Sequence, residues 1–119
     1  MGILSCLFCT DINRGVREFQ ATPGAVLLDV RTAREHDFKR IPNSQNLPLT
    51  DLDQAKDRFP DRDLPLYVYA YGGETRAKAA RQLKAMGFHN VHDIGGIKKC
   101  CGSQGYKGPA EGTRWHAST

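Results

Sequence analysis

The stretch LYVYAYGGETR, at residues 66–76, decides how the rest of the chain is arranged. Residues 66–69 are all apolar or aromatic, which is too short a run for a helix and typical of a strand covered on both faces. Two glycines interrupt the pattern, and residues 74–86 then place alanine and leucine among lysine and arginine at the period of an amphipathic helix that ends at Gly87. The stretch therefore predicts a strand, a tight loop and a helix in direct succession.

The predicted loop has the features of an anion-binding site. Backbone N–H groups of a glycine-rich turn and of the first helical turn have no partners within the helix, and they point toward the centre of the loop. Arg76 would add a positive charge at the helix start, whereas Glu74 disfavours a dianion. Ala70, at the end of the strand, would lie at the mouth of the loop. Tyr71 is either a pocket wall or an exposed aromatic residue.

A second buried strand is predicted over residues 25–30 and carries a polar residue near its end. Asp29 needs a partner if both faces of the sheet are covered, and Arg31 is the nearest candidate. Other predicted elements are a helix over 10–20 capped by Thr10 or Asp11, a short strand at 45–47, a helix over 49–59 starting at Thr50 or Asp51, and a strand at 91–94.

These segments resemble the rhodanese-like sulfurtransferases. In that family a six-residue loop begins with a catalytic cysteine, usually has glycine at its fourth position and ends in arginine or threonine. The loop AYGGET at residues 70–75 has Gly73 and Thr75 at those positions, with Ala70 in place of the cysteine. Asp29-Val30-Arg31 is similar to the family's Asp-Val-Arg motif, and Glu35 to the glutamate that follows it. Ile41-Pro42 is similar to the family's Ile-Pro pair, and Asn46 with Pro48 to its Asn-x-Pro motif. Gly95-Gly96-Ile97 resembles the family's step into a last helix.

The resemblance implies a site as well as a fold. The family's cysteine takes up a sulfane sulfur as a persulfide, and the loop stabilises the anionic intermediate. By this likeness Ala70 holds the nucleophile's position, and Asp29, Arg31 and Glu35 support the loops. The anion-binding residues are expected to be Tyr71, Gly72, Gly73, Glu74, Thr75 and Arg76.

A methyl group cannot carry sulfur, so we predict a protein of sulfurtransferase ancestry that is inactive or impaired in persulfide transfer from thiosulfate-like donors. Its expected ligand is a small sulfur-containing anion or a thiol acceptor, without a cofactor. Two alternatives stay open: a non-catalytic module that binds an anion or a protein, and sulfur transfer through Cys100 or Cys101.

The other cysteines and the histidines do not predict a metal site. Cys6 and Cys9 are two residues apart, but Cys100 and Cys101 are adjacent and would have difficulty reaching one tetrahedral zinc ion. His36, His89, His92 and His116 are interpreted as solvated or hydrogen-bonded histidines. Reduced thiols without a metal are the expected state, as in cytoplasmic proteins.

Composition sets the remaining limits. The chain has 119 residues, 39% of them hydrophobic, and a formal net charge of +4. The basic residues are scattered, which favours solvated helix faces over a nucleic-acid surface. Residues 1–9 are expected to form an apolar N-terminal segment without a membrane span, 10–101 a rhodanese-like domain, and 102–119 a loose C-terminal tail. We predict an α/β fold: a single rhodanese-like domain with a mainly parallel central sheet, helices on both faces and the site at the carboxyl ends of the strands, in a cytoplasmic protein of bacterial style.

Overall fold

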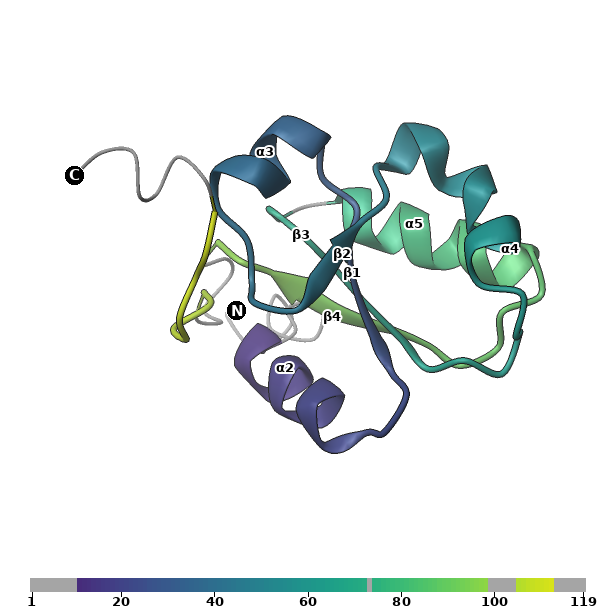
Figure 1. Ribbon diagram of the computed structural model, residues 1–119, viewed down its shortest axis with the longest axis horizontal. Helices are drawn as coiled ribbons and strands as arrows, with labels where there is room; N and C mark the ends of the chain where they lie inside the picture. The colour runs from purple at the N-terminus through teal and green to yellow at the C-terminus, as the bar shows by residue number, and fades with distance from the viewer. Residues whose placement is uncertain (1–10, 73, 99–104, 113–119) are drawn as a thin grey trace, which may run out of the picture.

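The computed structural model describes residues 11–72, 74–98 and 105–112 and contains one parallel sheet (Figure 1). The strand order is β2-β1-β3-β4, and each neighbouring pair is parallel. The strands are β1 (Val26–Asp29), β2 (Ser44–Asn46), β3 (Leu66–Ala70) and β4 (Val91–Gly96). All five residues of β3 are buried, as expected for a central strand covered on both faces. The predicted α/β fold is thereby confirmed.

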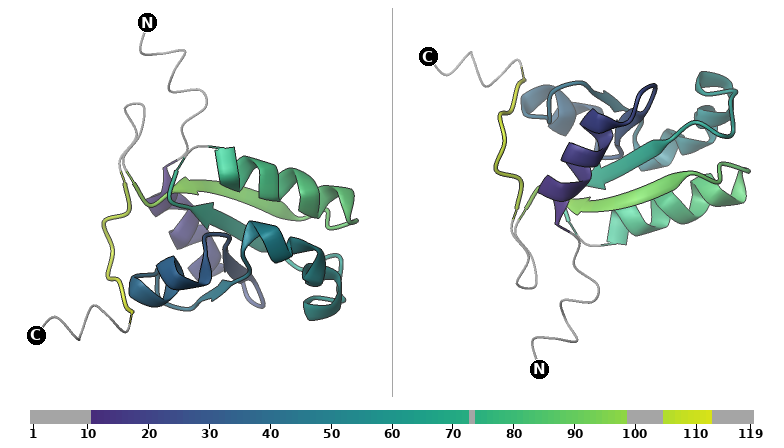
Figure 2. Two further views of the ribbon diagram at one scale, coloured as in Figure 1. Left: turned by 90° about the horizontal axis from the view of Figure 1, so that it is seen from above. Right: turned by 90° about the horizontal axis from the view of Figure 1, so that it is seen from below.

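Helices cover the two faces of the sheet unequally. Figures 1 and 2 show α2 (Ile12–Ala21) on one face of the sheet, and the 3-10 helix η1 (Leu49–Gln54), α4 (Ala55–Arg58) and α5 (Glu74–Ala85) on the other. Each face has its own apolar core. The larger core joins η1, α4 and α5 to the sheet, and the smaller one joins α2 to it.

The packing of α2 depends on its central glycine. Asp11 caps the helix, as one of the two predicted alternatives, by accepting a hydrogen bond from the backbone of Asn13 at 3.0 Å. A Cβ atom at Gly15 would lie only 2.3 Å from Cβ of Ile94 on β4. A larger residue at this position would therefore force α2 away from the sheet.

The prediction of one continuous helix over residues 49–59 is wrong. This segment divides into η1 and α4, with non-helical backbone angles at Asp51, and its first cap is Pro48. The backbone N–H of Leu49 donates to the carbonyl of Val30 at the end of β1, while Leu52 and Ala55 are buried in the larger core. Tertiary contacts at both ends of a short segment outweigh its local helical pattern.

The helix α3 (Ala33–Phe38) is absent from the sequence-based prediction. None of its described residues is buried, so no apolar period marks it. It starts with a capping box: the Thr32 hydroxyl accepts from the backbone of Glu35, and the Glu35 carboxylate accepts from the backbone of Thr32. The spacing Thr-x-x-Glu was the available signal.

Part of the segment predicted as a loose tail is packed against the domain. Arg40 and Glu111 form an antiparallel bridge, with backbone hydrogen bonds of 2.7 and 2.9 Å. Lys107 donates through its backbone to Asn13 on α2, and Tyr106 packs against the smaller core. Residues 105–112 therefore belong to the folded domain.

Two further predictions concern the end of the chain. The sequence predicts that the last strand ends at residue 94 and that Gly95 and Gly96 lead from it into a helix. In the structure both glycines belong to the strand and form the end of β4. The expected last helix would begin after Ile97, largely in residues 99–104, which lie outside the described residues. The apolar segment 1–9 lies outside them as well. Among the helices that are described, none has the length and apolar character needed to cross a bilayer.

Candidate functional site

The predicted loop lies at the carboxyl edge of the sheet, between the last residue of β3 and the start of α5. Its course is fixed by the chain that continues from β4: the backbone N–H of Ile97 donates to Ala70 at 2.9 Å, and that of Lys98 donates to Tyr71 at 3.0 Å. A Cβ atom at Gly96 would lie 2.5 Å from the carbonyl oxygen of Tyr71, so the loop can approach β4 this closely only beside a glycine. Gly73 lies outside the described residues.

A pocket of about 350 Å³, here called the loop pocket, opens beside this loop. The loop and α5 contribute Ala70, Tyr71, Gly72 and Thr75. Residues 30–32 and Glu35 form the wall opposite the loop, and residues 48–50 form another wall. Ala70 is 1% exposed, so its methyl group forms part of the buried floor.

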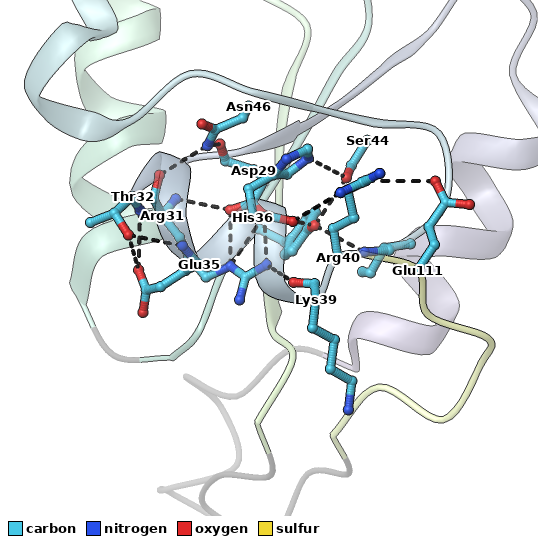
Figure 3. Close-up of polar contacts among 12 residues, drawn as sticks. Asp29, Arg31, Thr32, Glu35, His36, Lys39, Arg40, Ser44, Asn46 and Glu111 are labelled. Carbon is cyan, nitrogen blue, oxygen red and sulfur yellow. Dashed lines mark hydrogen bonds and ion pairs between the residues drawn. The ribbon is translucent and has the colours of Figure 1, made fainter. Parts of the chain in front are cut away.

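Arg31, on the opposite wall, is held by a buried ion pair with Asp29 (Figure 3). Nη2 of Arg31 lies 2.7 Å from Oδ2 of Asp29, and Nε and the backbone N–H of Arg31 donate to Oδ1. Burial alone would lower the pKa of Arg31, but the hydrogen bond and charge of Asp29 raise it above the ordinary value. The guanidinium is therefore a permanent cation whose charge is largely balanced by Asp29.

The hydroxyl of Tyr69 completes this buried network. It donates to Oδ2 of Asp29 at 2.9 Å, accepts from the backbone N–H of Ile41 at 3.2 Å, and lies 3.1 Å from Oγ of Ser44. His36 extends the chain of contacts, with Nε2 at 3.1 Å from the same Ser44 oxygen. The network links four segments of the chain immediately behind the loop pocket.

Further hydrogen bonds connect Arg31 and Asp29 to the residue after α3 and to the end of β2. Nη2 of Arg31 donates to the carbonyl of Lys39 at 2.6 Å, and the Asn46 amide donates to the carbonyls of Asp29 and Arg31. Glu35 is occupied by its capping bonds to Thr32, including one from the Thr32 hydroxyl at 3.0 Å. Arg31 and Glu35, which line the pocket, are thus both hydrogen-bonded, Arg31 to Asp29 and Glu35 to Thr32.

Arg76 does not join the loop pocket in the described part of the chain. Nη1 of its guanidinium lies 2.7 Å from Oδ1 and 2.6 Å from Oδ2 of Asp93 on β4, and its Nε is buried without a partner among the described residues. Glu74 is exposed at the start of α5, and Thr75 is half-buried and lines the pocket. Of the predicted loop residues that the structure describes, Tyr71, Gly72 and Thr75 therefore line the pocket, Glu74 is exposed outside its lining, and Arg76 fastens α5 to the sheet.

Tyr71 is 54% exposed, and Nζ of Lys98 lies 5.2 Å from the centre of its ring. Sequence reasoning missed Lys98, Asp93 and Tyr69 as residues around the site, because strand register brings them there. Cys100 and Cys101, like Cys6 and Cys9, lie outside the described residues. Within the described ranges, no group of three or more His, Cys, Asp or Glu residues could hold a metal ion.

Comparison with known proteins agrees with this architecture. The family model described as rhodanese-like domain matches residues 14–102. The chain belongs to the rhodanese-like domain family. The crystal structure of the Alr3790 protein from Anabaena sp. aligns with a TM-score of 0.71 and 27% identity, covering 92% of this chain and 86% of that one. A rhodanese with anions from E. coli aligns with a TM-score of 0.62 at 22% identity, covering 75% of this chain and 99% of the other, and supports the fold alone.

Relatives in this family include named sulfurtransferases. Thiosulfate sulfurtransferase GlpE of Pseudomonas syringae is 37% identical over 75 residues, which are 61% of this chain and 68% of GlpE. Adenylyltransferase and sulfurtransferase uba4 of Ogataea parapolymorpha is 30% identical over 88 residues, 73% of this chain. The chain spans only 23% of the uba4 protein and 60% of the uncharacterized protein YqhL of Bacillus subtilis.

Proposed function

We propose that this rhodanese-like domain has sulfurtransferase ancestry and that Ala70 occupies the position of the family's nucleophilic cysteine. On this proposal the loop pocket binds a small sulfur-containing anion but forms no persulfide at residue 70. The observation that carries the proposal is the placement of Ala70, which ends the central strand and forms the buried floor of a pocket beside the start of α5. The similarity to a thiosulfate sulfurtransferase supports the choice of ligand.

Ala70 ends the central strand, lines the pocket and lies just before α5, which is a suitable position for a nucleophile, but its side chain has no nucleophilic atom. N–H groups in the first turn of α5 have no acceptor within the helix, and the helix dipole favours negative charge there. A thiol at this point would lose its proton readily and attack sulfur as a thiolate. The alanine methyl has neither a proton to lose nor an electron pair to donate, so the pocket retains binding without nucleophilic catalysis.

Sulfur transfer from thiosulfate to cyanide tests this proposal in the chain and in an Ala70→Cys variant. In the variant, the thiolate should attack the outer sulfur of thiosulfate, the sulfur–sulfur bond breaks, and sulfite leaves. Cyanide then takes the sulfur from the persulfide as thiocyanate, and the thiolate is regenerated. We expect Ala70→Cys to form thiocyanate at least about 100-fold faster than the original chain.

An Ala85→Cys variant is the matched control, because Ala85 is an exposed residue at the far end of α5. It adds a thiol without placing it in the pocket and should be as inactive as the original chain. An inert Ala70→Cys protein that melts at the same temperature as the original would contradict the proposal and favour a non-catalytic binding module. Activity in the original chain that disappears in a Cys100→Ser/Cys101→Ser variant would instead assign the chemistry to those cysteines.

A further inference from the structure

A pocket of about 480 Å³, here called the α2 pocket, lies between α2 and the segment 105–112, which Figure 1 draws in yellow. Residues 106–109 form one side of it. The other side comes from the start of α2, where the lining residues after the cap follow the spacing of a single helix face: Asn13, Val16, Arg17 and Gln20. Among the described residues, none lines both this pocket and the loop pocket, so the function proposed above does not use it.

The side chain of Asn13 fastens the two sides of the α2 pocket to each other. Its Nδ2 donates to the carbonyl of Gly105 at 3.0 Å, and its Oδ1 accepts from the backbone N–H of Lys107 at 2.9 Å. Between these two points, the backbone N–H of Tyr106 donates to the carbonyl of Ile97 at 2.9 Å. Three hydrogen bonds to three successive residues therefore fix the segment against the domain at the pocket.

The turn over residues 106–109 is closed by its own side chain. The hydroxyl of Tyr106 donates to the carbonyl of Pro109 at 2.7 Å. A Cβ atom at Gly108 would lie only 2.5 Å from that hydroxyl oxygen, so the turn closes this tightly only around a glycine. A hollow with fixed walls and a volume within the range of roughly 300–1,000 Å³ that is usual for ligand sites favours a small molecule as its occupant.

The charged side chains of the α2 pocket differ in whether they have partners. The carboxylate of Asp11 is the cap of α2 and accepts from the backbone and the side-chain amide of Asn13, at 3.0 and 3.1 Å. The helix dipole also favours its negative charge at this end of α2. The side chains of Arg17 and Lys107 are exposed, and within the described part of the chain neither has a hydrogen bond or an ion pair. Two cations are thus available to a ligand, whereas the carboxylate is already bonded.

Apolar surface lies beside these cations. Val16 is 6% exposed and belongs to the smaller core, against which the half-buried Tyr106 also packs. Pro109 completes the apolar part of the lining. A tyrosine ring next to a proline offers a flat surface to an aromatic ligand, because aromatic rings stack or pack edge to face. The lining therefore combines an apolar part with two cations that have no other partner.

We propose that the α2 pocket binds a small aromatic carboxylate, whose charged group pairs with Arg17 and Lys107 and whose ring lies against Tyr106. The planar guanidinium of an arginine matches a carboxylate with two parallel hydrogen bonds, which is why this anion suits Arg17. The nearby charge of Asp11 disfavours a dianion such as a phosphate monoester, because like charges repel. The site goes beyond the proposed function and does not depend on it.

Three probes separate the charge from the ring in a titration followed by NMR of the isotope-labelled chain. Phenylacetate carries both ring and charge, acetate the charge alone, and phenylacetamide the ring alone. We expect phenylacetate to bind at least about tenfold more tightly than either of the others, because burial of the ring adds to the attraction of the charge. Its ring should shift the signals of Val16 and Tyr106 and leave those of Thr75 in the loop pocket unchanged.

Several results of this titration would overturn the inference. Phenylacetate that binds no more tightly than acetate or phenylacetamide would show that ring and charge do not act together. Binding that leaves the signals of Tyr106 in place would put the ligand elsewhere. Phenyl phosphate should bind more weakly than phenylacetate, and an equal or higher affinity for it would refute the choice of a carboxylate.

Variants assign the charge contribution to side chains. Arg17→Gln should weaken phenylacetate binding at least about fivefold and leave phenylacetamide unchanged, because only the carboxylate uses the guanidinium. Lys107→Gln should weaken phenylacetate about threefold. Arg81→Gln, which removes an exposed arginine of α5 that does not line the pocket, is the matched control and should change neither affinity. An unchanged affinity in Arg17→Gln, or an equal loss in Arg81→Gln, would refute the assignment to the α2 pocket.

The outcomes distinguish this inference from the proposed function, because the titration uses the original chain and requires no activity at residue 70. In the Ala70→Cys protein, saturating phenylacetate should leave the formation of thiocyanate unchanged, since the two pockets have separate linings. Inhibition that thiosulfate relieves by competition would place phenylacetate in the loop pocket and overturn the inference. An inert Ala70→Cys protein would contradict only the proposed function, while the titration still decides the α2 pocket.

Discussion

Replacing Tyr69 with phenylalanine removes one buried hydroxyl and should lower the free energy of unfolding by about 3 kcal/mol. Tyr69 is fully buried, and its hydroxyl donates to Asp29 and accepts from the backbone of Ile41. Losing a hydrogen bond to a carboxylate costs about 1.5–3 kcal/mol, and leaving the Ile41 N–H unpaired adds a penalty of about 1–3 kcal/mol, part of which relaxation recovers. Burial, reinforced by the charge of Asp29, raises the pKa of Tyr69 above its ordinary value, so the hydroxyl remains a proton donor.

Tyr67 provides the control, since it belongs to the same strand and its hydroxyl makes one partly buried contact, at 3.2 Å from Oγ1 of Thr22. Tyr67→Phe should cost only about 0.5–1 kcal/mol. Urea unfolding of the three proteins, extrapolated to water, measures both losses under the same conditions. Equal losses in the two variants would show that the hydroxyl of Tyr69 is not an essential member of the network and would refute this reasoning.

Two other predictions concern the pH dependence of stability and the packing of α2. Burial lowers the pKa of His36, whose ring contacts Ser44, below the value of 6.5 that it has when exposed. The unfolded chain then binds more protons just below pH 6.5, so the stability from His36 is present above that pH and declines as the pH falls toward its folded pKa. Urea unfolding at about pH 7.5 and about pH 5.5 measures how far the free energy of unfolding falls between the two pH values. This fall should be smaller for His36→Gln than for His92→Gln, the control at an exposed residue. Equal falls in the two variants would show that His36 is not the cause of the pH dependence. Gly15→Ala should destabilise the domain by about 1–3 kcal/mol because of its contact with Ile94, although alanine favours an isolated helix by about 1 kcal/mol; a higher melting temperature would contradict the close packing.

The sequence by itself determined the elements whose local pattern matches their burial. The run at 66–69 predicted the central strand because both faces of that strand are covered, and alternation of strands and helices predicted the parallel sheet. The pairing of Asp29 with Arg31 was predictable as well, since a buried carboxylate needs a partner and the nearest cation is two residues away. These are short-range relations between a residue and its neighbours.

Only the tertiary structure decided the features that depend on contacts between distant segments. Arg76 lies next to the loop in sequence, yet strand register brings Asp93 to it and withdraws its charge from the pocket. The exposed helix α3 lacks an apolar period, and the broken segment η1–α4 follows the core instead of its own helical pattern. The pocket that Phe38 borders is also lined by Tyr106 and Ala110, more than 60 positions further along the chain, because the Arg40–Glu111 bridge holds that segment there. Such contacts are set by the packing of the whole domain, and the periodicity of a single segment contains no record of them.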